Sequence, residues 1–85
     1  MDSPILGKLI IEFNQYSGKK KSLILSQIFL KYISSGKLMI GQRLPSSRKL
    51  AERLKVNRAT VIKAYEELEQ QGWIKSIVGS GYYIF

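Results

Sequence analysis

The sequence predicts a mainly α-helical fold of the α+β class: a short extended N-terminal arm, three helices and then two short β-strands. Apolar side chains recur at helical spacing in residues 22–35, 48–54 and 58–71. Two β-prone runs, residues 73–78 and 82–85, flank a glycine-bearing tripeptide that favours a tight chain reversal. A chain of 85 residues has room for one small core. We therefore expect an arm and loop over residues 1–21 and a single domain over residues 22–85.

The N-terminal segment combines a β-prone run with a polar loop. Residues 9–13 read Leu-Ile-Ile-Glu-Phe, which is typical of a strand or an extended arm, and residues 14–21 contain a Ser17-Gly18 break. The lysines at 19–21 are able to contact a phosphate, but a solvated loop is the favoured interpretation. No positive flank precedes an apolar run at the start, and no apolar stretch is long enough to span a membrane, so we expect a cytoplasmic protein.

The first predicted helix covers residues 22–35 and is apolar over much of its circumference. Ser22 is positioned to cap its N-terminus, and Gly36 suits the position just past its end. Burial in the core is the default explanation for the apolar surface, with a dimer contact as the alternative.

A short helix, a turn and a longer helix follow. Pro45 and the serines after it are typical of a helix start, and residues 48–54 then form the short helix. Residues 55–57 interrupt it, with Asn57 as a strong N-cap for the helix over residues 58–71. Gly72 ends that helix because it tolerates positive φ.

Composition argues against catalysis and in favour of an anionic partner. The chain contains no cysteine and no histidine, and its six carboxylates form no close pair of the kind that glycosidases or metal sites use. Its net charge of +8 fits a nucleic-acid partner, although other basic proteins share it. Residues 22–56 hold seven basic side chains and one acidic one, whereas residues 57–72 hold two basic and three acidic ones. This polarity suits a helix that presents only one end to phosphates.

A short helix and a longer one joined by a tight turn constitute a helix-turn-helix, whose second helix reads the major groove through its N-terminal residues. Arg58 is able to bond two guanine acceptors at once, and Lys63 is better placed for a phosphate. The candidate DNA-contacting residues lie at the two helix starts and the hairpin tip: Ser46, Ser47, Arg48, Asn57, Arg58, Thr60, Lys63, Gly79, Ser80 and Gly81.

Structural alternatives stay open for several of these residues. Asn57 is as easily a cap as a base contact, and Thr60 is able to bond within its own helix. Ile62 either meets a thymine methyl or covers the edge of the core, and we favour the second. The glycine-bearing tip over residues 79–81 is also what a tight hairpin requires by itself.

The joint spacing of residues 41–51, 56–61, 64–68 and Gly72 closely resembles the DNA-binding domain of the GntR family of bacterial transcription regulators. Residues 45–48, 64–66 and 78–81 look most like its MocR subfamily, and residues 5–16 look like the arm that precedes the first helix in that group. The resemblance implies a winged helix-turn-helix that binds double-stranded DNA operators as a homodimer and responds to a small molecule sensed by a C-terminal domain. In MocR proteins that domain is aminotransferase-like and binds pyridoxal phosphate.

Three residues depart from the family pattern. Lys55 stands where a glycine is usual, Asn57 replaces the common serine or threonine, and Ile62 lies where many relatives outside the MocR group carry arginine. The 85 residues contain no effector domain and imply no cofactor of their own, so we expect an N-terminal fragment rather than a very short regulator. The ending at Phe85 favours the fragment.

Three other functions compete with DNA binding. A winged helix that binds a protein would carry apolar residues on the outer face of its third helix, where this sequence has arginine, lysine and threonine. An RNA-binding domain would expose aromatic side chains or an arginine-rich arm. An enzyme would need catalytic groups that the composition does not supply.

Overall fold

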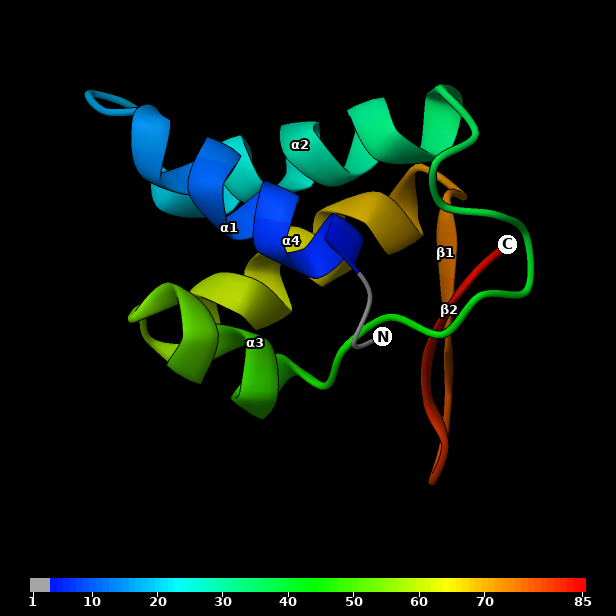
Figure 1. The fold of residues 1–85 in the computed structure, drawn as a ribbon. Helices are drawn as coiled ribbons and strands as arrows, with labels where there is room; N and C mark the ends of the chain where they lie inside the picture. The colour runs from blue at the N-terminus through cyan, green and yellow to red at the C-terminus, as the bar shows by residue number, and fades with distance from the viewer. Residues whose placement is uncertain (1–3) are drawn as a thin grey trace.

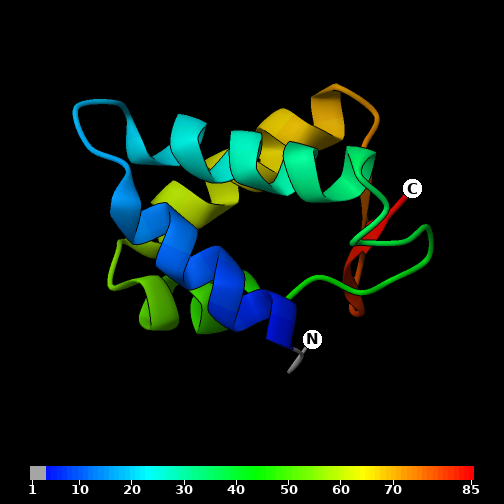
Figure 2. The same cartoon turned by 45° about the horizontal axis from the view of Figure 1, so that its top comes forward.

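Six elements make up the computed structural model, which describes residues 4–85; residues 1–3 of the predicted arm lie outside the described residues. The helices are α1 (Pro4–Gln15), α2 (Lys21–Ser34), α3 (Ser47–Leu54) and α4 (Arg58–Gln70), and the strands are β1 (Ile74–Ile77) and β2 (Gly81–Ile84). In Figure 1 the hairpin stands at one side of the helices, and Figure 2 shows α1 lying between α2 and α3. The predicted mainly α architecture with a two-stranded wing is confirmed.

The N-terminal segment is a helix, so the prediction of a strand or extended arm over residues 9–13 was wrong. Leu6, Leu9 and Phe13 recur at helical spacing, and all three are buried where α1 packs against α2 and α3. The β propensity of the isoleucine pair at 10–11 is weaker than the free energy gained by burying this stripe. The described chain thus has four helices rather than three.

The start of α2 differs from the prediction in its cap. Lys20 occupies the N-cap position but its side chain makes no capping bond, and Ser22 lies inside the helix as a buried residue. The C-terminal prediction is confirmed, because Gly36 follows the helix with a φ of 80°.

The helix-turn-helix forms as predicted, with one cap confirmed and one not. The Ser46 hydroxyl accepts a hydrogen bond from the Lys49 backbone N–H at 3.1 Å and caps α3. Asn57 takes the N-cap position of α4, but its side chain makes no capping bond. Lys55, in the turn, has a φ of 58° and is the one residue other than glycine with a positive φ among residues 4–85.

The wing is attached to the segment that leads into α3. Strands β1 and β2 pair antiparallel, with Ile74 opposite Ile84 and Ile77 opposite Gly81. The outer edge of β2 bonds to residues 41–44: Leu44 N–H donates to Tyr82 O at 2.8 Å, and Ile84 N–H donates to Gln42 O at 2.9 Å. The orientation of the wing is therefore coupled to the start of the helix-turn-helix.

Tyr65 of α4 holds the centre of the core. Its ring contacts Phe29 of α2 edge-on, with centroids 5.7 Å apart, and Tyr82 of β2 at 4.6 Å. Its hydroxyl donates to the Pro45 carbonyl at 2.7 Å, and burial raises the pKa of Tyr65 well above its usual range. One side chain thus connects α4 to α2, to the wing and to the segment before α3.

Candidate nucleic-acid interface

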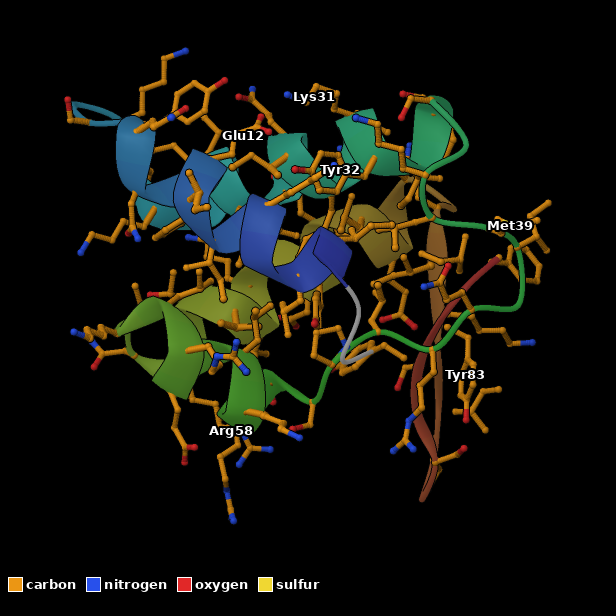
Figure 3. All side chains as sticks on the ribbon, in the orientation of Figure 1. Glu12, Lys31, Tyr32, Met39, Arg58 and Tyr83 are labelled. Atoms are coloured by element: carbon orange, nitrogen blue, oxygen red, sulfur yellow. The ribbon has the colours of Figure 1, made fainter. Side chains whose placement is uncertain are left out.

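The first residue of α4 is bonded to the first residue of α3. Arg58 Nε donates to Ser47 Oγ at 2.9 Å, and Ser47 is only 5% exposed. Because this bond uses Nε, it fixes the exposed guanidinium while its terminal NH₂ groups are left for another acceptor. Arg58 lies at the lower edge of the molecule in Figure 3. The N-termini of α3 and α4 therefore meet at one cationic surface.

The serines before Arg48 have structural roles at this surface. Ser46 caps α3 and Ser47 positions Arg58, while Arg48 itself is exposed in the first turn of α3. Whether the two serines also contact DNA stays a prediction.

The exposed face at the start of α4 carries the remaining predicted residues of this helix. Asn57 and Lys63 are exposed, and Thr60 is half-buried. The Asn57 side chain does not cap α4, which weakens the alternative that this residue serves only as a helix cap. Ile62 is half-buried beside them, so both of its interpretations stay open.

Lys63 has a cationic neighbour that the sequence did not indicate. The close approach of the Lys63 side chain lowers the pKa of Lys20. The two lysines share a small hollow with Ser22 and Ser26, between the start of α2 and the middle of α4. No periodicity relates residues 20 and 63, because their proximity arises only when α2 packs on α4. A pair of adjacent ammonium groups favours an anion there.

The hairpin tip has a conformation that only glycine adopts easily. Gly79 has a φ of 77° and Gly81 a φ of 128°, and Ser80 N–H donates to Ile77 O at 3.0 Å to close the turn. The Ser80 hydroxyl bonds to the Tyr83 hydroxyl. A Cβ on Gly81 would lie 3.2 Å from Nε of Arg43, so a further cation missed by the sequence prediction lies against the wing.

The far half of α4 and the opposite face carry the acidic groups. Glu69 accepts a hydrogen bond from Ser76 N–H of β1 at 3.0 Å, and Glu66 and Glu67 are exposed. On the α1–α2 side, an ion pair with Lys31 lowers the pKa of Glu12, which also accepts from Tyr32 (Figure 3). Apart from Glu52 of α3, the carboxylates of residues 4–85 thus lie away from the N-termini of α3 and α4.

Residues 4–85 hold neither a membrane-spanning helix nor a metal-binding cluster. None of the helices there is long and apolar enough to cross a membrane. The same residues hold no group of three or more His, Cys, Asp or Glu side chains placed to bind a metal.

A capped short helix, a tight turn, a longer helix with a cationic N-terminus and an antiparallel hairpin beside it define a winged helix-turn-helix. Residues 26–84 match the family described as bacterial regulatory proteins, gntR family. The chain belongs to this family and is a GntR-type DNA-binding domain.

Curated relatives agree with this assignment. The chain is 36% identical over 64 residues to the arabinose metabolism transcriptional repressor of Geobacillus stearothermophilus, covering 75% of this chain and 18% of the relative. It is 52% identical over 44 residues to the HTH-type regulator YcxD of Bacillus subtilis, covering 52% and 10%. It is 32% identical over 77 residues to the pyridoxine biosynthesis regulator PdxR of Corynebacterium glutamicum, covering 91% and 17%. The chain thus spans under a fifth of these relatives.

Solved structures share the fold. YtrA from Sulfolobus acidocaldarius, a GntR-family transcription factor, superposes with a TM-score of 0.78 at 33% identity, covering 88% of this chain and 79% of that one. AraR(DBD), solved in complex with operator ORX1, gives a TM-score of 0.73 at 25% identity, covering 84% of each chain.

Proposed function

We propose that this chain is the operator-reading head of a bacterial transcription regulator and that α4 enters the major groove of double-stranded DNA. The observation that carries the proposal is the Arg58–Ser47 hydrogen bond, which joins the N-termini of α3 and α4 at one exposed cationic surface. The likeness to AraR(DBD), a domain solved on its operator, supports the same use of the fold.

Within this proposal, α4 supplies the base contacts. The terminal NH₂ groups of Arg58 bond the O6 and N7 acceptors of a guanine, a contact that discriminates by about 1–3 kcal/mol. Asn57 and Thr60, beside it, reach neighbouring base edges or the adjoining phosphate.

Phosphate contacts fix the register of the domain on the duplex. Arg48 and the N-terminal amides of α3, at Ser46 and Ser47, bind the backbone at one side of the groove. Lys63 binds it at the other side, with Lys20 as its neighbour. The wing tip (residues 79–81) follows the backbone or the minor groove, where its lack of bulk permits close approach.

We further propose that the domain works in the cytoplasm as part of a homodimer of MocR type. The similarity to PdxR over 91% of this chain supports the subfamily. In that case a C-terminal domain would bind pyridoxal phosphate and sense the effector, and this chain would hold no cofactor. No catalytic reaction is assigned to it, since the relatives are named as regulators.

The proposal is tested by selecting bound DNA from a random duplex pool and then measuring affinity for the selected site by fluorescence anisotropy. We expect a defined half-site containing a guanine, bound about a thousandfold or more tightly than scrambled duplex. Enrichment of no sequence, with affinity set by salt alone, would contradict sequence-specific binding.

A further inference from the structure

A hollow lies where α1, the α1–α2 loop and the end of α3 meet. Its volume is about 700 Å³. We propose that this basic pocket binds a small organic anion that has an apolar body and a phosphate or carboxylate group. Its charged lining residues are all cationic: Lys19, Lys21, Arg53 and Lys55.

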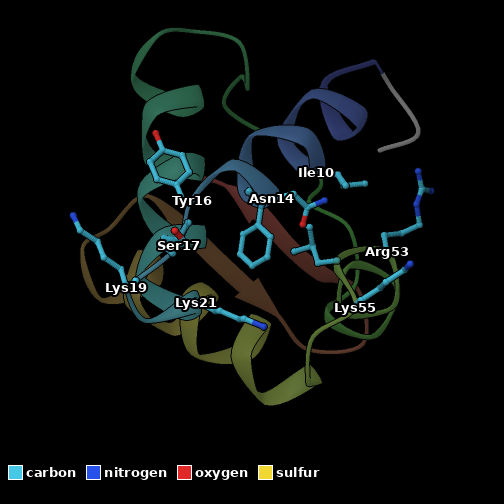
Figure 4. A pocket seen from close by; sticks show the side chains of 12 residues that line it. Ile10, Asn14, Tyr16, Ser17, Lys19, Lys21, Arg53 and Lys55 are labelled. Atoms are coloured by element: carbon cyan, nitrogen blue, oxygen red, sulfur yellow. The ribbon is translucent and has the colours of Figure 1, made fainter.

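The charges come from two separate parts of the chain. Figure 4 shows Lys19 and Lys21 on one side of the pocket and Arg53 and Lys55 on the other, with Ile10 and Asn14 between them. The lining contains no aspartate or glutamate, and within residues 4–85 none of the four cations forms an ion pair with a carboxylate. Four cations around one hollow, with no carboxylate among the lining residues, attract an anion to it.

The base of the pocket is apolar, so an anion with an apolar body fits it better than a purely polar one. Phe13, Ile24 and Leu54 are buried beneath it, and Ile10 is half-buried. The rim adds hydrogen-bonding groups from Asn14, Tyr16 and Ser17. An apolar base with a few polar groups around it is the usual chemistry of a small-molecule site, and the volume falls within the range of roughly 300–1,000 Å³ typical of such sites.

A backbone phosphate of DNA fits this pocket less well. It supplies negative charge to the rim but no apolar group to cover the base. A phenyl or short alkyl body attached to the anionic group would remove that apolar surface from water. The observations therefore favour a free small molecule over the nucleic acid.

The pocket also adjoins the helix-turn-helix. Leu54 is the last residue of α3, and Lys55 begins the turn that leads to α4. A ligand there would contact the turn itself, so occupancy would alter DNA binding without a separate effector domain. This regulatory consequence rests on the proposed function, whereas ligand binding does not.

Ligand binding is tested without DNA, by titrating the ¹⁵N-labelled chain with phenyl phosphate and with inorganic phosphate. We expect amide signals of residues 13–24 and 53–55 to move, with phenyl phosphate half-saturating at about one-fifth the concentration of inorganic phosphate or less. Lys21→Gln/Arg53→Gln should raise the half-saturating concentration about fivefold. The control Lys8→Gln/Lys75→Gln, with the same change in net charge outside the pocket, should change it by less than about twofold.

Three results of these titrations would overturn the proposal, and a fourth comes from competition with DNA. The three are equal affinity for the two probes, an equal loss in the control variant, and signal changes centred on Arg48 and Arg58 instead of the pocket. Displacement of phenyl phosphate by excess duplex, with a larger loss of DNA affinity in the pocket variant than in the control, would assign the pocket to the DNA backbone instead. If the double variant is unfolded, the single variant Arg53→Gln, at an exposed position, is titrated in its place. The same results would then support or overturn the proposal.

Discussion

Arg58 Nε lies 2.9 Å from Ser47 Oγ, so the residue that begins the reading helix is held by the residue that begins the helix before it. The bond crosses the turn and restricts a long, otherwise flexible side chain. An arginine positioned before it meets DNA loses less conformational entropy on binding than a free one.

Ser47→Ala should therefore weaken operator binding by about three- to tenfold, which is the effect of one hydrogen bond, with little change in the thermal unfolding midpoint. Anisotropy titration and calorimetry measure the two quantities. In an Arg58→Ala background the same substitution should have no further effect. An equal loss in both backgrounds would show that Ser47 acts independently of Arg58. Ser35→Ala, which removes a hydroxyl at the end of α2, is the control.

Arg58→Ala should reduce affinity for the selected operator by about 1–3 kcal/mol and flatten the preference between operator and scrambled duplex. Arg58→Lys should recover affinity for scrambled duplex but not the preference, because an ammonium cannot bond two acceptors in a planar fork. Parallel titrations on both duplexes measure this. Equal weakening on the two would exclude a base-reading role.

Lys63→Ala should lower affinity for all sequences alike and reduce the slope of log affinity against log salt by about one. The slope is obtained from titrations at several salt concentrations. Lys37→Ala, a change of the same charge near Tyr32, should alter the slope much less. An unchanged slope for Lys63→Ala would remove this residue from the phosphate contacts.

Lys55→Gly should stabilise the fold by roughly 0.5–1 kcal/mol. The left-handed backbone costs a residue with a Cβ about 1–2 kcal/mol, while glycine loses more conformational entropy on folding. Urea unfolding measures the difference. Lys55→Ala keeps the Cβ and removes the charge, so it should leave the strain in place. Stabilisation by alanine as large as by glycine would point to charge repulsion as the cause.

Tyr65→Phe should destabilise the fold by about 1–3 kcal/mol, because it leaves the buried Pro45 carbonyl without its donor. The folded-state pKa of Tyr65 is raised, so its contribution is fully present below the unfolded value of about 10 and is lost as the pH rises above it. Urea unfolding at about pH 8 and about pH 10.5 should show a smaller alkaline loss in the phenylalanine variant. Tyr83→Phe, on the half-exposed wing, is the control; an equal change there would contradict the assignment to Tyr65.

The sequence predicted the elements whose signals are local. Helical spacing and turn residues located α2, α3, α4 and the wing to within a residue or two, and Ser46 caps α3 as its type suggests. The strand prediction for α1 failed because the burial of Leu9 and Phe13 against other helices outweighs local β propensity. Helix formation there depends on packing partners from α2 and α3.

In the candidate site, too, local features could be predicted from the sequence and features that depend on packing could not. Its residue types could be read from the motif, but the Arg58–Ser47 bond and the Lys20–Lys63 pair depend on how helices pack. The inability of Asn57 to cap α4 is likewise a matter of side-chain orientation, which residue type does not determine.

The contact between Tyr65 and Tyr82 has a mechanical consequence. Because the two rings lie 4.6 Å apart between α4 and β2, their contact restrains the distance between the reading helix and the wing. A duplex that contacts both α4 and the wing must fit the distance between them. Local groove width would then count toward recognition even at base pairs that no side chain touches.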